Sequence, residues 1–141
     1  MEVKLGIGID GISFGVSQHS LRDMIGEPDK IDVDHDELPL LKYNRLMCTF
    51  WMDESDRLHW IQSSNPLLTL QNTKVIGMEV LDIISKLALA FGYSYEFEDY
   101  GSMDSYSFPE HELEIQSEYG IVTGICFGHY WEDDEPLYAN A

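Results

Sequence analysis

Basic residues are scarce in this sequence. It contains 8 Lys and Arg against 26 Asp and Glu, which gives a formal net charge of −18. Every basic residue lies between Lys4 and Lys86, and from Leu87 to Ala141 there are twelve acidic residues and no Lys or Arg. Because a phosphate backbone is bound through Lys and Arg, nucleic acid is excluded as a partner, and an anionic membrane surface is disfavoured. The same charge would attract a basic protein, although it also serves solubility alone.

Cysteines and long apolar runs are also scarce. Cys48 and Cys126 are far apart in the sequence and form no metal motif or disulfide framework, so we expect buried, reduced thiols. No apolar run approaches the roughly 20 residues of a membrane-spanning helix. The first ten residues, interrupted by Glu2 and Lys4, do not resemble a signal peptide, and we therefore expect a cytoplasmic protein.

Two glycine motifs resemble those of enzymes but lack the required context. Residues 6–11 match G-x-G-x-x-G, yet the helix that a dinucleotide site needs is expected only from Ser17 onward. Residues 11–15 match the G-x-S-x-G nucleophile motif, but the chain is too short for the hydrolase fold that carries it. We interpret these glycines as turn residues, and we expect no catalytic residue and no cofactor.

The sequence does not predict a metal site. Asp32, Asp34 and Asp36 occupy the first three ligand positions of a calcium loop, but Glu37 and Tyr43 replace the glycine and the glutamate that such a loop requires. The five histidines show no spacing typical of zinc ligands. We therefore expect no bound metal, and a solvated acidic loop over residues 30–39 with a short strand near Ile31.

Hydrophobic periodicity predicts an α+β fold of two related halves that form one compact unit. The first half spans residues 1–64 and the second residues 65–131, with an acidic C-terminal tail at 132–141. The expected elements are a strand at 3–9, a helix from Ser17 to Gly26, a hairpin at 46–63, a helix at 80–91, a strand at 93–98 and a hairpin at 113–129. Residues 14–16 align with 76–78 at an offset of 62. This order predicts two αβββ-type repeats, with an antiparallel sheet and helices packed on one face.

Strand alternation predicts which side chains point away from the helices. Leu46, Cys48, Phe50 and Met52 form the face expected to pack on a helix, so Trp51 points the other way. In the second half the residues expected on the open face are Glu96, Glu98, Glu112 and Glu114. An open face with four carboxylates and an aromatic residue suits a basic partner, and a merely solvated sheet face is the alternative.

The segment from Gly15-Val16-Ser17 through Leu21 to Ile25-Gly26-Glu27-Pro28 resembles a helix signature of small αβ modules. These modules include the tandem-repeat beta-lactamase inhibitor protein family and single-module lipoproteins of outer-membrane assembly. The motif itself covers about fourteen residues. The second half lacks the Gly-Glu-Pro after its helix. It implies an antiparallel sheet packed on helices and used as a protein-binding surface, but it transfers no binding residue. Small acidic proteins of this build also resemble immunity proteins of bacteria.

These observations favour a non-catalytic, cytoplasmic protein that neutralises a basic toxin, for example a nuclease, by occluding its active site. The expected partner-binding residues are Glu96, Glu98, Glu112, Glu114, Asp99 and Asp104, with Trp51 or Tyr100 as an aromatic anchor. One alternative is a structural or assembly adaptor that binds a neutral protein through an edge strand or the same face. A second is a small enzyme that uses Asp99 and Asp104 as paired carboxylates.

Overall fold

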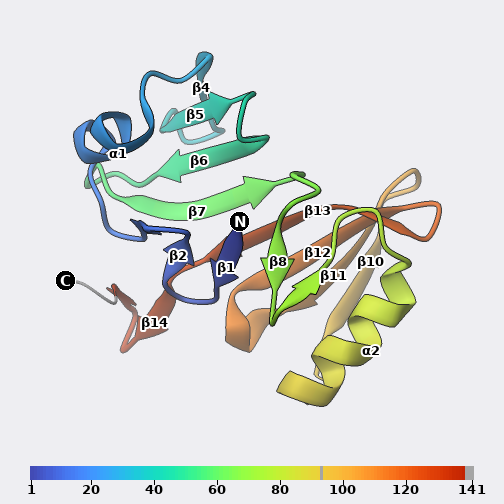
Figure 1. Cartoon of the computed structure of the whole chain (residues 1–141). Helices are drawn as coiled ribbons and strands as arrows, with labels where there is room; N and C mark the ends of the chain where they lie inside the picture. Colours follow the sequence, from blue (N-terminus) through green and yellow to red (C-terminus); the bar gives the residue numbers. More distant parts are fainter. Residues whose placement is uncertain (93, 139–141) are drawn as a thin grey trace.

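The computed structural model describes residues 1–92 and 94–138, and within them the chain is mainly β. It contains an eight-stranded, a five-stranded and a two-stranded sheet, and only two α-helices (Figure 1). The prediction of an α+β fold built from two αβββ repeats with helices covering a sheet is therefore wrong. The prediction failed because each helix is followed by a meander of four strands rather than three, and because the short strands of the five-stranded sheet leave little periodic signal.

The eight-stranded sheet is antiparallel throughout and contains two consecutive four-stranded meanders. The first meander is β4 (Lys30–Val33), β5 (Pro39–Tyr43), β6 (Cys48–Met52) and β7 (Leu58–Ser63). The second is β10 (Glu96–Asp99), β11 (Asp104–Phe108), β12 (Leu113–Glu118) and β13 (Ile121–Gly128). The strand order is β10-β11-β12-β13-β7-β6-β5-β4, so β7 and β13 pair at the centre and β10 and β4 form the edges.

The five-stranded sheet brings together the segments that precede the two helices. Its strands are β1 (Glu2–Lys4), β2 (Gly8–Ile9), β3 (Ile12–Ser13), β8 (Thr69–Leu70) and β9 (Thr73–Lys74), in the order β3-β2-β1-β8-β9. The strand expected over residues 3–9 is therefore two strands, separated by a turn at Gly6, whose φ of 75° suits glycine. Of the glycines of the G-x-G-x-x-G motif, Gly6 and Gly11 lie in the connections that flank β2, whereas Gly8 lies within β2 itself, so the interpretation as a turn residue is wrong for Gly8.

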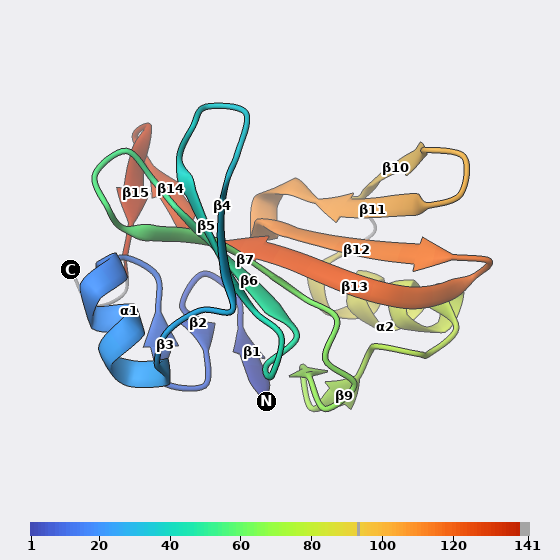
Figure 2. The same ribbon diagram turned by 90° about the horizontal axis from the view of Figure 1, so that it is seen from above.

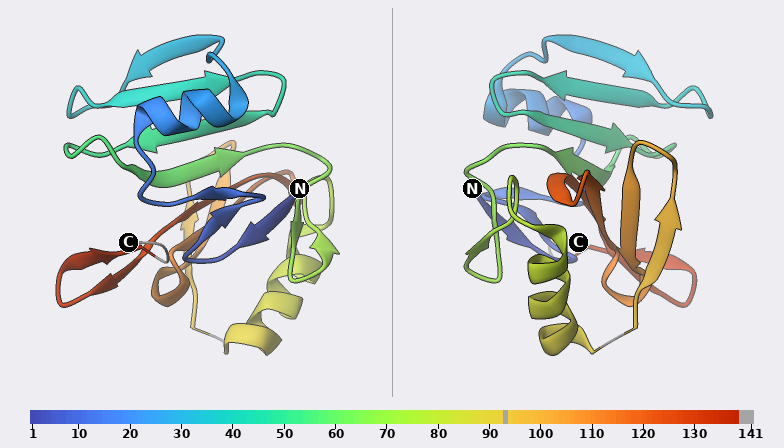
Figure 3. Two further views of the ribbon diagram at one scale, coloured as in Figure 1. Left: turned by 60° about the vertical axis from the view of Figure 1, so that its left-hand side comes forward. Right: turned by 90° about the vertical axis from the view of Figure 1, so that its right-hand side faces the viewer.

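Each helix lies against one meander. The first helix, α1 (Gln18–Ile25), buries only Leu21, whereas α2 (Val80–Phe91) buries five of its residues. Figure 3 shows α1 beside β5 and β6, and Tyr43 donates a hydrogen bond from its hydroxyl to the carbonyl of Gly26 at 2.8 Å. The ring of Phe91 at the end of α2 contacts Phe108 edge-on, with centroids 6.0 Å apart. The positions expected for both helices agree with the structure.

The chain enters the two helices through the same hydrogen bonds. Gly15 donates its N–H to the carbonyl of Leu58, and Leu58 donates to Val16, both at 2.8 Å. In the second half Gly77 donates to Val122 at 2.8 Å and Val122 to Met78 at 2.9 Å. The equivalent residues before the helices, Gly15 and Gly77, are 62 positions apart, as in the sequence alignment. Their equivalent hydrogen-bond partners in the strands, Leu58 and Val122, are 64 positions apart. The division at residues 64/65 and 131/132 stays a prediction.

Side chains on one face of the large sheet form the core with the helices and the small sheet. One continuous row crosses six strands and is buried along its whole length; it consists of Phe108, Leu113, Phe127, Ile61, Phe50 and Leu41. Figure 2 shows that α1, α2 and β1–β3 all lie on this side of the sheet. Within the described residues, neither helix and none of β1–β3 lies on the opposite face.

Candidate functional site

We call this opposite side of the eight-stranded sheet the outer face. The strand register places in one row Glu96, Ser107, Glu114, Cys126, Gln62, Thr49, Lys42 and Lys30. A neighbouring row contains Gly128, Trp60, Trp51, Leu40 and Asp32. Figure 2 shows the β4–β5 hairpin on one side of this face and the β10–β11 hairpin on the other. The outer face is thus a broad surface with one half from each meander.

Three of the expected partner-binding carboxylates gather on the second half of the outer face. Glu96 and Glu98 are exposed on the edge strand β10. Glu114 on β12 is half-buried and accepts a hydrogen bond of 2.6 Å from the hydroxyl of Ser105. Glu96 and Glu114 flank the same residue of β11, Ser107, one from each neighbouring strand. These three residues, Glu96, Glu98 and Glu114, are called the carboxylate cluster.

The other acidic residues expected at the site lie apart from this cluster. Glu112 ends the 3₁₀ turn η1 (Pro109–His111) with a φ of 46°, and burial raises the pKa of its carboxyl group. Asp99 and Asp104 oppose each other in the β10–β11 pair, but strand alternation turns them away from the outer face. Asp99 accepts a hydrogen bond from the backbone N–H of Gly101 at 2.8 Å, as turn-forming aspartates do.

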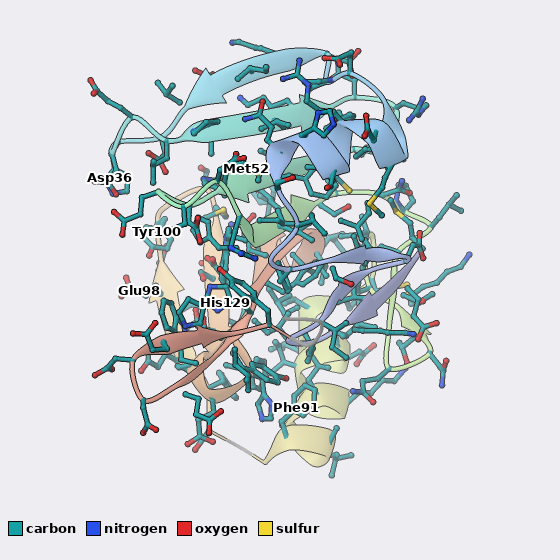
Figure 4. The ribbon with its side chains drawn as sticks, turned by 90° about the vertical axis from the view of Figure 1, so that its left-hand side faces the viewer. Asp36, Met52, Phe91, Glu98, Tyr100 and His129 are labelled. Carbon is teal, nitrogen blue, oxygen red and sulfur yellow. The ribbon has the colours of Figure 1, made fainter. Side chains whose placement is uncertain are left out.

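The two expected aromatic anchors occupy different parts of the surface. Tyr100 follows β10 and is 60% exposed, and Figure 4 shows it in the same hairpin as Glu98. Trp51 is half-buried on β6, on the outer face but three strands from β12. The structure therefore places Tyr100 beside the carboxylate cluster and Trp51 on the opposite half of the outer face.

Trp60 is a further residue of the outer face, and strand alternation alone does not predict its orientation. It pairs directly with Trp51, because the register of β6 and β7 shifts between Trp51 and Met52 and leaves His59 as an extra residue. The Trp60 ring covers Gly128, where a Cβ atom would come within 2.5 Å of it. A bulge of this kind breaks the two-residue alternation, which is why periodicity could not assign Trp60 to a face.

The first half of the outer face carries basic side chains that are already paired. The ammonium groups of Lys30 and Lys42 lie 3.4 and 3.6 Å from the carboxylate of Asp32. Hydrogen bonding to the backbone of Val33 and the nearby lysines lower the pKa of Asp32. The charge of the outer face is therefore uneven, with unpaired carboxylates on β10 and ion pairs on β4 and β5.

A second polar region lies where the chain expected as an acidic tail folds back. Residues of that segment form a hairpin of β14 (Tyr130–Glu132) and β15 (Glu135–Leu137), and residues 139–141 lie outside the described part of the chain. The Tyr138 hydroxyl donates a hydrogen bond to Asp53 at 3.0 Å, and burial together with this carboxylate raises the pKa of Tyr138 to about 12. This hydrogen bond joins the segment after β15 to the turn between β6 and β7.

This region contains a pocket of about 720 Å³ whose residues include Arg57, His59, His129 and Trp131. The rings of His59 and His129 are 6.4 Å apart, and His129 is almost fully buried. Among the described residues, the buried Nε2 of His59 has no hydrogen-bond partner, and burial lowers the pKa of this histidine. No sequence motif indicates that these two histidines meet, because His59 and His129 are seventy positions apart.

The described residues contain no group of three or more His, Cys, Asp and Glu side chains placed to hold a metal ion. Cys48 and Cys126 are both buried and free, and burial raises the pKa of Cys126 to about 12. Within residues 1–92 and 94–138, no helix is both long and apolar enough to cross a membrane.

Comparison with known proteins gives a similarity of fold alone. No family model and no curated protein matches the sequence. An extracellular protein containing an SCP domain from Bacillus anthracis str. Ames superposes with a TM-score of 0.55 at 14% identity, over 97% of this chain and 55% of that chain. This chain therefore spans about half the length of that protein. A DUF4309 family protein (YjgB) from Bacillus subtilis subsp. subtilis str. 168 superposes with a TM-score of 0.54 at 11% identity, over 88% of each chain.

Proposed function

We propose that this protein is a non-catalytic binding protein that recognises a basic protein through the outer face of its eight-stranded sheet. The observation that supports this most is the carboxylate cluster on β10–β12, which neither helix nor the second sheet covers. Glu96 and Glu98 are exposed, and the described part of the chain places no Lys or Arg within ion-pair distance of either. Such unpaired carboxylates are available to Lys and Arg of a partner.

The net charge of −18 would act on such a partner before contact. Complementary potentials steer diffusional encounter and raise association rates, and they do so less as salt increases. The carboxylate cluster would then fix orientation, because its three residues lie at defined register positions on β10 and β12, the two neighbours of β11. Trp51 and Trp60 offer large ring surfaces on the other half of the face, and aromatic residues are frequent energetic centres of interfaces.

The specific role we propose is that of a cytoplasmic immunity or inhibitor protein for a basic toxin, such as a nuclease. A nuclease binds an anionic substrate through a basic active site, and the carboxylate cluster on the outer face presents the complementary charge. Inhibition would then be steric, since a bound sheet of this size covers the active site without any reaction.

The experiment is affinity capture from lysate of the source organism with three forms of the protein. The first is unchanged, the second carries E96Q, E98Q and E114Q, and the third carries D23N, E79Q and D82N. The third form loses the same three charges at exposed positions on α1, at the N-cap of α2 and on α2. We expect the unchanged and third forms to retain one basic protein near stoichiometry, and the second form to lose it.

Equal retention by the second and third forms would contradict the site assignment, because long-range charge alone would then explain binding. For a captured partner, the association rate of the unchanged protein should fall steeply with added NaCl. Inhibition is tested by titrating the partner's own activity, for example nuclease activity, with this protein. An undiminished activity at saturation would reject the inhibitor role and leave binding itself intact.

A structural or assembly adaptor is the second candidate function, and the open edge of β10 favours it. An adaptor that binds a neutral protein would show weak salt dependence and insensitivity to the E96Q, E98Q and E114Q changes. The hypothesis of an enzyme using Asp99 and Asp104 gains no support from the contacts of these residues, since Asp99 is engaged in a turn.

A further inference from the structure

The edge strand β10 combines an open backbone edge with two chemically different faces. Within the described part of the chain, β10 pairs with β11 alone, so one side of its backbone has no strand partner. All four of its residues are exposed. An unpaired strand edge presents a row of N–H and C=O groups to which a further extended segment can hydrogen-bond. This edge is therefore a geometric template for strand addition.

The two faces of β10 differ in chemistry. Glu96 and Glu98 point to the outer face, and Phe97 points to the inner side, where it is 52% exposed. The Phe97 ring lies 5.0 Å from that of Tyr106, and Tyr95 is 5.7 Å from Phe108, so both extend the aromatic edge of the core. A strand added beside β10 would bury this apolar surface with its inward side chains and would place its outward side chains beside the glutamates.

The opposite edge of the same sheet serves as an internal comparison. β4 is also an edge strand, and its Ile31 is 48% exposed on the inner side. On its outward side, however, Asp32 forms ion pairs with both Lys30 of the same strand and Lys42 of β5. Lysine on an edge strand is a common protection against unwanted pairing. Of these two edge strands, as far as the chain is described, β10 alone combines exposed apolar surface with unpaired charge of a single sign.

We propose that β10 binds an extended segment of the basic partner in which Lys or Arg alternates with apolar residues, as an added ninth strand of the sheet. This inference rests on the proposed function and specifies its mode of contact. The basic residues would face Glu96 and Glu98, and the apolar residues would cover Phe97 and Tyr95. Pairing of two copies through β10 is disfavoured, because it would bring the glutamates of both copies together in one sheet face.

The test uses the full chain and four capped synthetic peptides, each built from three Lys and three Val residues. The first is Lys-Val-Lys-Val-Lys-Val, and the second is its block isomer Lys-Lys-Lys-Val-Val-Val. The third is the alternating peptide N-methylated at its valines, with a fourth N-methylated at its lysines as its counterpart. In a strand, the N–H groups of alternate residues point to opposite edges, so only one of the two methylated forms loses the hydrogen bonds to β10.

We expect the alternating peptide to slow amide hydrogen exchange within β10, one methylated form to retain that protection, and the block isomer to bind about tenfold more weakly. Equal binding of the alternating and block peptides without protection of β10 would overturn strand addition and leave electrostatic recognition by the outer face standing. No binding by any of these peptides would overturn strand addition as well, and the capture experiment would then decide the proposed function independently.

A pair of protein variants tests the apolar side. F97E should weaken binding of the alternating peptide about tenfold. The contact between the peptide valines and the Phe97 ring is lost, and a charged side chain takes its place beside those valines. I31E places the same change on the edge strand β4 and should leave the affinity unchanged. Similar losses in both variants would overturn the assignment to β10. Circular dichroism and urea unfolding of the two variants establish that each is folded.

Discussion

At the residue scale, His59 links the eight-stranded sheet to the C-terminal hairpin. It is the extra residue of the bulge in β7, and this position places its ring near His129 in the pocket beneath the β14–β15 hairpin. His129 in turn packs against Tyr138, with ring centroids 5.2 Å apart. Burial is the main cause of the lowered pKa of His59, followed by the opposing effect of Asp53. The neutral ring therefore suits this site better than the charged one.

The first prediction at this scale concerns pH. A histidine whose pKa is lowered on folding binds fewer protons in the folded state, so its penalty is absent above about pH 6.5 and grows as the pH falls below that value. We expect H59Q to lose less unfolding free energy than the unchanged protein between pH 7 and pH 5. Urea unfolding at a series of pH values measures this difference. H19Q, a change at an exposed position on α1, should behave like the unchanged protein, and parallel curves for all three would contradict the prediction.

At the scale of elements, the two helices are equivalent in position but differ at their N-termini. Ser17 caps α1, and its hydroxyl accepts a hydrogen bond of 3.1 Å from the N–H of Ser20. Glu79 occupies the equivalent position before α2 and makes no side-chain capping bond. A glutamate side chain is longer than those of the preferred capping residues Ser, Asp and Asn. The longer α2 compensates by burying five residues instead of one.

This difference predicts opposite effects of two substitutions. S17A should lower the free energy of unfolding by about 1 kcal/mol, because one N–H of the first turn loses its acceptor. E79D keeps the negative charge at the N-terminus of α2 and introduces a shorter capping side chain, so it should raise the free energy of unfolding by about 0.5 kcal/mol. Urea unfolding monitored by circular dichroism measures both. A loss of stability in E79D would mean that the Glu79 side chain has contacts that outweigh a cap.

For the whole molecule, the sheet joins two meanders that carry charge of different kinds. Lys30 and Lys42 are paired with Asp32 on the first meander, whereas the chain from Leu87 onward contains no Lys or Arg at all. Because β7 and β13 pair at the centre, both meanders contribute to one outer face. The unfavourable self-repulsion of a chain with a net charge of −18 is therefore concentrated in the second half.

Self-repulsion predicts that salt stabilises the fold. Raising NaCl from about 0.01 M to about 1 M shortens the Debye length from about 30 Å to about 3 Å, which screens repulsion between surface carboxylates. The urea midpoint should rise over this range. The rise should be smaller for the E96Q, E98Q and E114Q variant, whose formal charge is three units less negative. An unchanged or falling midpoint would contradict the prediction, because salt would then remove at least as much stability by screening ion pairs as it adds by screening repulsion.

Local signals in the sequence located several elements but missed others. The residues of both helices, the hairpin strands β6 and β7, and the strand near Ile31 follow from apolar spacing and turn residues. β5 and β11 were missed, since β5 starts at Pro39 and β11 contains two serines, and both are weak strand signals. The strand expected over 93–98 is observed as β10 from Glu96, and Tyr93 lies outside the described residues.

By itself the sequence determined the acidic charge, the two helices with their termini, the 62-residue offset and the outward direction of Glu96, Glu98, Glu114 and Trp51. These properties depend on composition or on neighbours within a few positions, where the periods of helix and strand apply. Only the tertiary structure decided that both halves share one eight-stranded sheet, that Trp60 pairs with Trp51, that His59 meets His129 and that β10 forms an open edge. The physical reason is that these contacts join residues distant in sequence, and strand order and bulges leave no local periodic signal.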